Sequence, residues 1–418
     1  MITTYYLMNK DNPVLSFEIS EEGPLQTYQN PKILGTLPLD LKNIADWIKS
    51  RYVIMERKQS EELMNSLGLT DDKSRIEFTN CASLFDSFWV KSIDSPIEWK
   101  DVSLYRNDFS VYLSKFTMNE PIDVNAPKNI RHLSPEYHSD GSFDRCWLWS
   151  SKGVSLLKAG SYGYSNAGKE PYSEVYANQL EKALGYTDYV EYSLLYYPRR
   201  IAGIKNMVNS LVTSCEIMTT EEIGLLSASK LGIQTYEELI DYCAAISDKE
   251  REKVIDLLIL DCLTFNTDRH LSNVSMFVEN DTQKVLGVSK IYDNNMALSP
   301  YYIPEYDGTL EEYTSELATK LGMEFDDLFL LCYENSSRKA EIRQKLRNIA
   351  SSFAFTYVGQ DYKLFPKERL EMLTQVTKKQ AQHLLNISRG RSVPVLTQDS
   401  SVSEEFEEDG GFPPFSFS

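Results

Sequence analysis

A polar loop over residues 266–273 places an Asp and an Asn five positions apart, Asp268 and Asn273, and a second Asp, Asp293, follows the Asn by twenty positions. Carboxylate and amide oxygens are ligands for Mg²⁺, and a carboxylate can orient or deprotonate a hydroxyl. Phosphoryl transfer needs little more from a protein than these groups and cations on the phosphates. The three residues therefore predict phosphate transfer. The alternative is a capped loop in which Asp268 and Asn273 satisfy backbone N–H groups.

The elements on either side of this loop should hold it in place. Residues 249–265 are apolar nearly all round, which predicts a helix buried in the middle of a lobe. Apolar runs at 274–278 and 285–291 flank a polar turn and predict a β-hairpin. Because the strands of a hairpin are antiparallel, we expect Asp293 to return beside Asn273. The spacing D-x-x-x-x-N, with a second Asp after a hairpin, is that of a kinase catalytic loop.

The run NTDRH at 266–270, followed by Asn273 and then by Tyr292-Asp293, resembles the HipA-like bacterial Ser/Thr kinase family. A related DRHxxN loop occurs in the phosphoinositide kinases. The likeness covers about residues 134–387 in plan, and its specific part is 261–298. It implies a bilobed protein-kinase-like α+β fold that uses ATP and Mg²⁺. By this resemblance, Asp268 orients or deprotonates the acceptor hydroxyl, and Asn273 and Asp293 bind Mg²⁺.

Two charged residues upstream complete the expected nucleotide site. The run VSLLKAG at 154–160 looks like the strand whose Lys, here Lys158, pairs with the α- and β-phosphates. Glu174, on the next helix, would be its partner, since an inward-facing Lys needs a carboxylate to stay charged. Two solvated surface charges are the alternative.

The loop that covers the phosphates should precede this strand. The compact candidate is Ser139-Asp140-Gly141-Ser142, in which Gly141 and Ser142 would contact the nucleotide, and an ordinary turn is an equal alternative. Since some HipA-like kinases modify a Ser in this loop, Ser139 and Ser142 are candidate autophosphorylation sites. A Gly- and Ser-rich stretch at 160–168 is either a flap near the phosphates or an exposed connection.

Four regions follow from changes in pattern along the chain: a small α+β unit at 1–127, a kinase N-lobe at 128–218, a helical C-lobe at 219–392 and a disordered acidic tail at 393–418. The first should have a core of Trp47, Phe88, Trp89 and Trp99. Expected strands are 5–8, 14–19, 146–150, 154–159, 190–197 and 211–218. Expected helices are 41–51, 171–184, 221–231, 236–246, 249–265, 310–321, 324–334, 338–353 and 367–387.

Composition limits the partners. A net charge of −18 over 418 residues repels nucleic-acid backbones and anionic lipid surfaces, so neither is expected as a partner. The six cysteines are scattered, and no leader or long apolar run is seen, which indicates a cytoplasmic protein. We expect a protein substrate and, if the resemblance extends to biology, a small antitoxin-like regulator. The alternatives are a lipid or small-molecule kinase, disfavoured by the acidic stretch 300–312, and a nucleotide-binding pseudokinase that acts as an interaction module.

Overall fold

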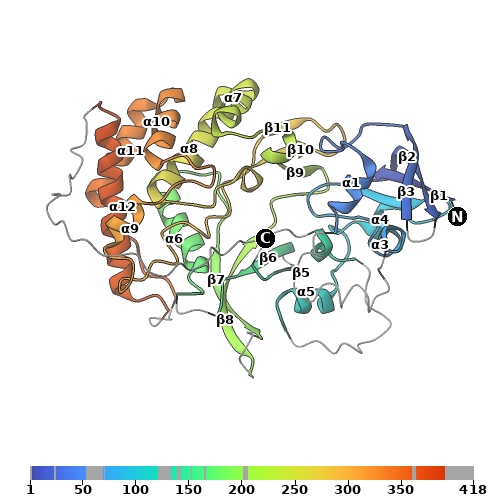
Figure 1. The fold of residues 1–418 in the computed structure, drawn as a ribbon, viewed down its shortest axis with the longest axis horizontal. Helices are drawn as coiled ribbons and strands as arrows, with labels where there is room; N and C mark the ends of the chain where they lie inside the picture. The colour runs from blue at the N-terminus through green and yellow to red at the C-terminus, as the bar shows by residue number, and fades with distance from the viewer. Residues whose placement is uncertain are drawn as a thin grey trace, which may run out of the picture.

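The computed structural model describes residues 2–22, 25–52, 69, 71–120, 133–138, 143–151, 153–163, 166–200, 206–359 and 364–390. Within these ranges the strands form three sheets, ordered β3-β2-β1-β4, β5-β6-β8-β7 and β11-β10-β9. Figure 1 shows the first sheet at one end of the molecule, helices α10, α11 and α12 at the other end, and the two remaining sheets between them. The tail expected at 393–418 lies outside the described residues.

The first sheet is antiparallel and carries short helices. Its strands are β1 (Ile2–Asn9), β2 (Asn12–Glu22), β3 (Leu25–Ile33) and β4 (Phe88–Ser92), and the helices are α1 (Ile44–Lys49), α3 (Asp72–Thr79), α4 (Trp99–Val102) and α5 (Val111–Thr117). The strands and the helix expected here are confirmed. The four expected core aromatics are all buried. This unit is not isolated, because Leu84, Leu104 and Phe109 share a hydrophobic cluster with Trp147 and Val154 of the second sheet.

The second sheet contains β5 (Arg145–Ser150), β6 (Gly153–Ala159), β8 (Val208–Glu216) and β7 (Ser193–Arg199), which pair antiparallel throughout. Helix α6 (Glu170–Ala183) lies between β6 and β7 in the chain and packs on this sheet. Each strand expected in this region is present, and the expected helix begins one residue earlier than its Pro. Four antiparallel strands with one packed helix make up the β-rich lobe of the fold.

The third sheet corrects one expectation. Residues 221–231, which we expected to form a helix, instead form β9 (Ile223–Ser227) and the 3-10 turn η3 (Ala228–Leu231). β9 pairs with β10 (Ser275–Glu279) along its length, and β10 pairs with β11 (Val285–Val288). On the other side of β9, Leu225 N donates to Phe85 O (2.7 Å). Partners on both sides outweigh a local helical preference.

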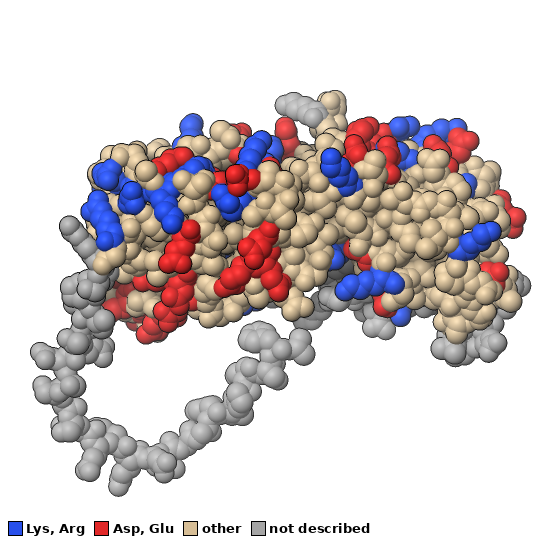
Figure 2. All heavy atoms as spheres, turned by 90° about the horizontal axis from the view of Figure 1, so that it is seen from above, with Lys and Arg blue, Asp and Glu red and all other residues tan. Residues whose placement is uncertain are grey.

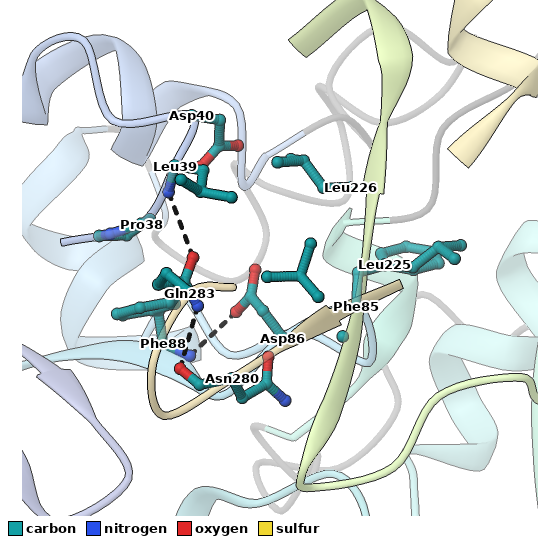
Figure 3. Close-up of a pocket in the computed structure, with 12 residues that line it drawn as sticks. Pro38, Leu39, Asp40, Phe85, Asp86, Phe88, Leu225, Leu226, Asn280 and Gln283 are labelled. Atoms are coloured by element: carbon teal, nitrogen blue, oxygen red, sulfur yellow. Dashed lines mark hydrogen bonds between the residues drawn. The ribbon is translucent and has the colours of Figure 1, made fainter. Parts of the chain in front are cut away.

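The hairpin between β10 and β11 reaches the first unit with its turn. Asn9 Nδ2 donates to Asn280 O (2.8 Å), and Leu39 N donates to Gln283 Oε1 (3.2 Å). Figure 3 shows the small hollow at this junction, with Leu39 and Asp40 on one side and Leu225 and Leu226 of β9 on the other. The hairpin turn therefore connects the first unit to the third sheet.

The rest of the chain forms a helical lobe. Its helices are α7 (Tyr236–Ile246), α8 (Asp248–Thr264), α9 (Leu310–Ser315), α10 (Phe325–Asn335), α11 (Lys339–Ser352) and α12 (Lys367–Ile387). As expected, α7 and α8 begin after the N-caps Thr235 and Ser247, and α8 is buried nearly all round. α9 is shorter than the helix expected at 310–321, because the chain after Ser315 closes into a turn in which Ala318 bridges Glu324.

Together the β-rich lobe and the helical lobe make a bilobed protein-kinase-like α+β fold, to which the N-terminal unit is added. On the face drawn in Figure 2, Lys and Arg gather at the end of the helical lobe. Helix α11, which lies at that end in Figure 1, contains Lys339, Arg343, Lys345 and Arg347. The negative net charge is therefore unevenly spread over this face. None of the helices in the described ranges has the length and apolar character required to cross a bilayer.

Candidate active site

Lys158 lies in the middle of a buried charge cluster. It projects from β6, is 7% exposed, and its Nζ is 3.1 Å from Oε1 of Glu174 on α6. The same ammonium also contacts the carboxylate of Asp293, which comes from the other lobe. A buried charge persists only where it is paired and hydrogen-bonded. The alternative of two solvated surface charges for Lys158 and Glu174 is therefore wrong in this structure.

The three charges of this cluster shift one another's pKa values. Burial acts to lower the pKa of Lys158, but Asp293 and Glu174 outweigh it, so the pKa lies above its ordinary value. Burial raises the pKa of Glu174 more than Lys158 lowers it. Burial also acts to raise the pKa of Asp293, but the Lys158 ammonium outweighs it and holds this pKa below the usual range. The Lys158 ammonium thus keeps the Asp293 carboxylate charged in spite of its burial.

The backbone around Asp293 turns its side chain toward Lys158. Asp293 has φ of +60°, a left-handed conformation that is uncommon for a residue with a side chain. Asn294 N donates to Glu174 Oε2 (2.7 Å), and Asp293 N donates to the Tyr192 hydroxyl (3.2 Å). Such conformations persist where the surroundings fix them and are concentrated at functional sites. Here the two hydrogen bonds connect the segment after the hairpin to Glu174 of α6 and to Tyr192.

Arg269 joins the polar loop to the segment that carries Asp293. Its guanidinium is 1% exposed and pairs with Asp261 on α8, with Nε 2.9 Å from Oδ2. Nη1 donates to the carbonyls of Asn273 (3.1 Å) and Tyr292 (2.6 Å). One side chain thus holds the residue expected to bind Mg²⁺ in the loop and the residue before Asp293. The backbone at Asn273 and the backbone at Tyr292 are thus joined through one guanidinium.

The route to this convergence differs from a simple hairpin. The second strand, expected to run to residue 291, ends as β11 at Val288. Ile291 then forms an isolated parallel bridge with Tyr189, just before β7. The chain therefore leaves β10 before it reaches Asp293, and the Arg269 guanidinium, rather than a continuous ladder, spans the remaining gap.

Asp268 lies at the open side of the loop. Its N–H donates to Asn266 Oδ1 and its carbonyl accepts from Asn273 Nδ2, both at 3.2 Å, so its backbone is fixed. The side chain is 33% exposed, and its Oδ1 lies 3.3 Å from Nζ of Lys320. Asp268 is therefore the accessible carboxylate of the site, while Asp293 is held inside by Lys158.

The oxygen atoms of Asn273 and Asp293 suit a Mg²⁺ ion that is bound together with substrate phosphates. Within the described ranges, no group of three or more His, Cys, Asp or Glu side chains could hold a metal ion. Mg²⁺ is usually bound by one or two carboxylates together with substrate phosphates. Asn273 uses its Nδ2 in the bond to Asp268, which leaves the amide oxygen as the ligand atom. Asn273 and Asp293 would hold the ion, which would neutralise phosphate charge.

Sequence reasoning missed three cations of the site. Arg145 on β5 lies directly opposite Lys158 in the strand register, so the two side chains share a face, and its charge helps to lower the pKa of Asp293. Ser150 pairs with Gly153 in the same register, and the short spacing between the two expected strands could have indicated that Arg145 lies opposite Lys158. Arg269 belongs to the run NTDRH at 266–270, but the sequence alone assigned it no role. Lys320 gave no signal, because only the tertiary fold brings it to Asp268.

The expected phosphate-covering loop falls outside the described part of the chain. Gly141 and Ser142, with Ser139, lie outside the described residues, as do residues 164 and 165 of the Gly- and Ser-rich stretch. At the start of that stretch, Gly160 packs tightly, and a Cβ there would lie 2.7 Å from Glu170 Oε2. Its carbonyl also accepts from Nη2 of Arg199 (3.0 Å). The beginning of the stretch is therefore fixed by contacts.

Comparison with known proteins gives distant likenesses. The sequence matches no protein-family model and no curated protein. The fold is similar to the proinflammatory kinase CtkA of Helicobacter pylori, with 12% identity and a TM-score of 0.37 over 59% of this chain and 93% of that one. It is also similar to a chain of the Shewanella oneidensis MR-1 toxin–antitoxin complex of HipA, HipB and operator DNA, with 12% identity and a TM-score of 0.45 over 93% of this chain and 100% of that one. A Golgi casein kinase gives 12% identity and a TM-score of 0.32 over 60% of this chain and 72% of that one. Likenesses at this level assign no family to the chain.

Proposed function

We propose that this chain is an ATP- and Mg²⁺-dependent HipA-like kinase that transfers the γ-phosphate to a Ser or Thr hydroxyl of a protein, its own chain included. The observation that carries the proposal is the buried contact of Lys158 with both Glu174 and Asp293, which joins the β-rich lobe to the segment after the polar loop. An ion pair between a strand Lys and a helix Glu, beside a carboxylate that follows the catalytic loop, is the arrangement that protein kinases use.

Each residue has a separate task in this proposal. Lys158 binds the α- and β-phosphates, Glu174 keeps it in place, and Asn273 and Asp293 hold Mg²⁺, which shields phosphate charge. Asp268 accepts the proton of the acceptor hydroxyl. The acceptor oxygen forms a bond to the γ-phosphorus while the bond from that phosphorus to the bridging oxygen breaks, and ADP leaves with the electron pair.

The experiment follows labelled phosphate from ATP. The full chain is incubated with labelled ATP, Mg²⁺ and a cell lysate, and Asp268→Ala is compared with Asp241→Ala, which changes an exposed carboxylate of α7. We expect Asp268→Ala to lose about a hundredfold or more in rate, as for loss of a general base. Nucleotide binding, measured by calorimetry, should survive in Asp268→Ala and lose its Mg²⁺ dependence in Asp293→Asn.

The outcomes separate the proposal from its alternatives. Transfer by Asp268→Ala at the wild-type rate would remove the catalytic role of this residue. A wild-type chain that binds nucleotide and transfers nothing would be a pseudokinase, and label on lipid rather than protein would change the acceptor class. The resemblance extends the proposal to a small antitoxin-like regulator, which co-purification with the full chain would test. A cytoplasmic location, expected from the scattered cysteines, stays a prediction.

A further inference from the structure

The accessible carboxylate of the site faces a lysine from a distant part of the chain. Nζ of Lys320 lies 3.3 Å from Oδ1 of Asp268, and the two side chains are 56% and 33% exposed. An exposed pair of this kind contributes little to stability, because water screens it and two long side chains lose freedom. Stabilisation of the fold therefore does not account for the position of Lys320 beside Asp268.

A closed turn presents Lys320 to the site. Ala318 bridges Glu324, and within this bridge Thr319 N donates to Met323 O (2.9 Å) and Gly322 N donates to Thr319 O (2.9 Å). Gly322 has φ of +78°, a conformation that glycine adopts without strain. The backbone that carries Lys320 is thus fixed by its own hydrogen bonds, unlike that of a lysine on a long open loop.

The same turn is attached to the loop that carries Asp268. Thr319, next to Lys320, is 5% exposed and hydrogen-bonds with the Tyr236 hydroxyl. That hydroxyl donates to Arg269 O (2.8 Å), the carbonyl of the residue after Asp268. Turn and loop are therefore held at a fixed separation through the first residue of α7. The approach of Lys320 to Asp268 is a consequence of this connection and not a chance meeting of two surface side chains.

The distribution of charge indicates what Lys320 would meet. Lys158 lies inside, against Glu174 and Asp293, at the proposed nucleotide end of the site. Lys320 lies at the other end, where the acceptor hydroxyl would reach Asp268. The transferred phosphoryl group passes between these two ends, with negative charge on its three equatorial oxygens. A cation already beside the carboxylate that receives the proton is placed to stabilise that charge.

We propose that Lys320 is a further catalytic residue of the proposed kinase site, which contacts the γ-phosphoryl group during transfer and pairs with Asp268 when no substrate is bound. The inference rests on the proposed function. Bond changes are those of the transfer described above, and Lys320 neither gives up nor receives a proton. It adds to Lys158 a second cation, contributed by the turn at 318–324.

The test uses nucleotide binding as well as turnover. Lys320→Met removes the charge, Lys320→Arg keeps it, and Lys249→Met is the matched control at an exposed lysine in the first turn of α8. Dissociation constants for ADP and for a non-hydrolysable ATP analogue are measured by calorimetry with Mg²⁺. We expect Lys320→Met to weaken the analogue about tenfold and to lower kcat at least as much, with ADP affinity unchanged. Lys320→Arg should recover most of both losses.

Each contrary result has its own meaning. An unchanged ratio of analogue to ADP affinity in Lys320→Met, with kcat at the wild-type level, would overturn the inference and leave the proposed function standing. Equal weakening of ADP and analogue binding would mean a structural role for Lys320. A rise in the KM for the acceptor alone would mean that Lys320 contacts the acceptor. Either result would overturn the inference. A wild-type chain that binds neither nucleotide would sink the proposed function, and the inference with it.

Discussion

Replacing Arg269 with Met is expected to destabilise the helical lobe strongly. The substitution leaves the Asp261 carboxylate, which is 0% exposed, without the guanidinium that now pairs with it at 2.9 Å. Breaking a buried pair by removing one partner costs about 3 to 5 kcal/mol. Met is an unbranched side chain that fills irregular space, so little of this loss comes from a cavity. The carbonyls of Asn273 and Tyr292 lose a donor as well, so we expect a free-energy cost toward the upper end of this range.

The loss should depend on pH with a defined sign. Burial already raises the pKa of Asp261 above its ordinary value, against the charge of Arg269. Without the arginine this folded-state pKa rises further, so the folded variant binds a proton more readily than the unfolded chain does. Stability of Arg269→Met relative to wild type is therefore highest near about pH 4 and falls as pH rises through the raised folded-state pKa.

Native-state hydrogen exchange at the amides of α8 is the appropriate measurement, because a chain of this length does not unfold in one step. Arg347→Met, at an exposed arginine of α11, serves as the control and should leave protection unchanged. The double variant Asp261→Leu/Arg269→Met should regain at least half of the loss, since it removes the unpaired charge. Unaltered α8 protection in Arg269→Met, or a double variant as weak as the single one, would refute the reasoning.

Two further predictions concern joints between elements. Glu252 accepts hydrogen bonds from Ser336, Ser337 and Arg338, which outweigh burial and lower its pKa to about 2. Glu252→Gln should lower the free energy of unfolding by about 2 kcal/mol at neutral pH. In acid unfolding, the difference in stability between variant and wild type should disappear as pH falls from about 4 to 2, because the wild-type carboxylate becomes protonated and loses its charge. A difference that stays constant with pH would contradict this. Gly224→Ala would place a Cβ 2.6 Å from Phe85 O, so the variant should lose about 1 to 3 kcal/mol of stability. Differential scanning fluorimetry should show a lower melting temperature, and an unchanged value would mean that the backbone between Gly224 and Phe85 moves apart at no cost.

Local patterns predicted the parts of the fold that depend on them. The apolar periodicity of α8 and the N-caps Thr235 and Ser247 placed two helices to within one residue. The spacing of Asp268 and Asn273 marked the polar loop, and the apolar runs after it predicted the hairpin of β10 and β11. These features lie within short stretches of chain, so neighbouring residues are sufficient to specify them.

Features that depend on distant partners were not predictable in this way. Residues 223–227 were assigned to a helix because their own pattern permits one, and the strand exists because β10 and Phe85 offer hydrogen-bond partners on both sides. Lys320 meets Asp268 only through the folded turn at 318–324. The length of α9 likewise depends on that turn. A single sequence contains no signal for such contacts.

The hydrophobic cluster shared by the N-terminal unit and the second sheet limits how the protein can be divided. Trp147 and Val154 belong to the β-rich lobe, whereas the residues that cover them, Leu84, Leu104 and Phe109, precede the supposed boundary at residue 127. A truncated chain that begins after that point would leave this apolar surface open to water and prone to self-association. The two kinase-like lobes should therefore be expressed, crystallised or grafted into chimeras only together with the first 120 residues.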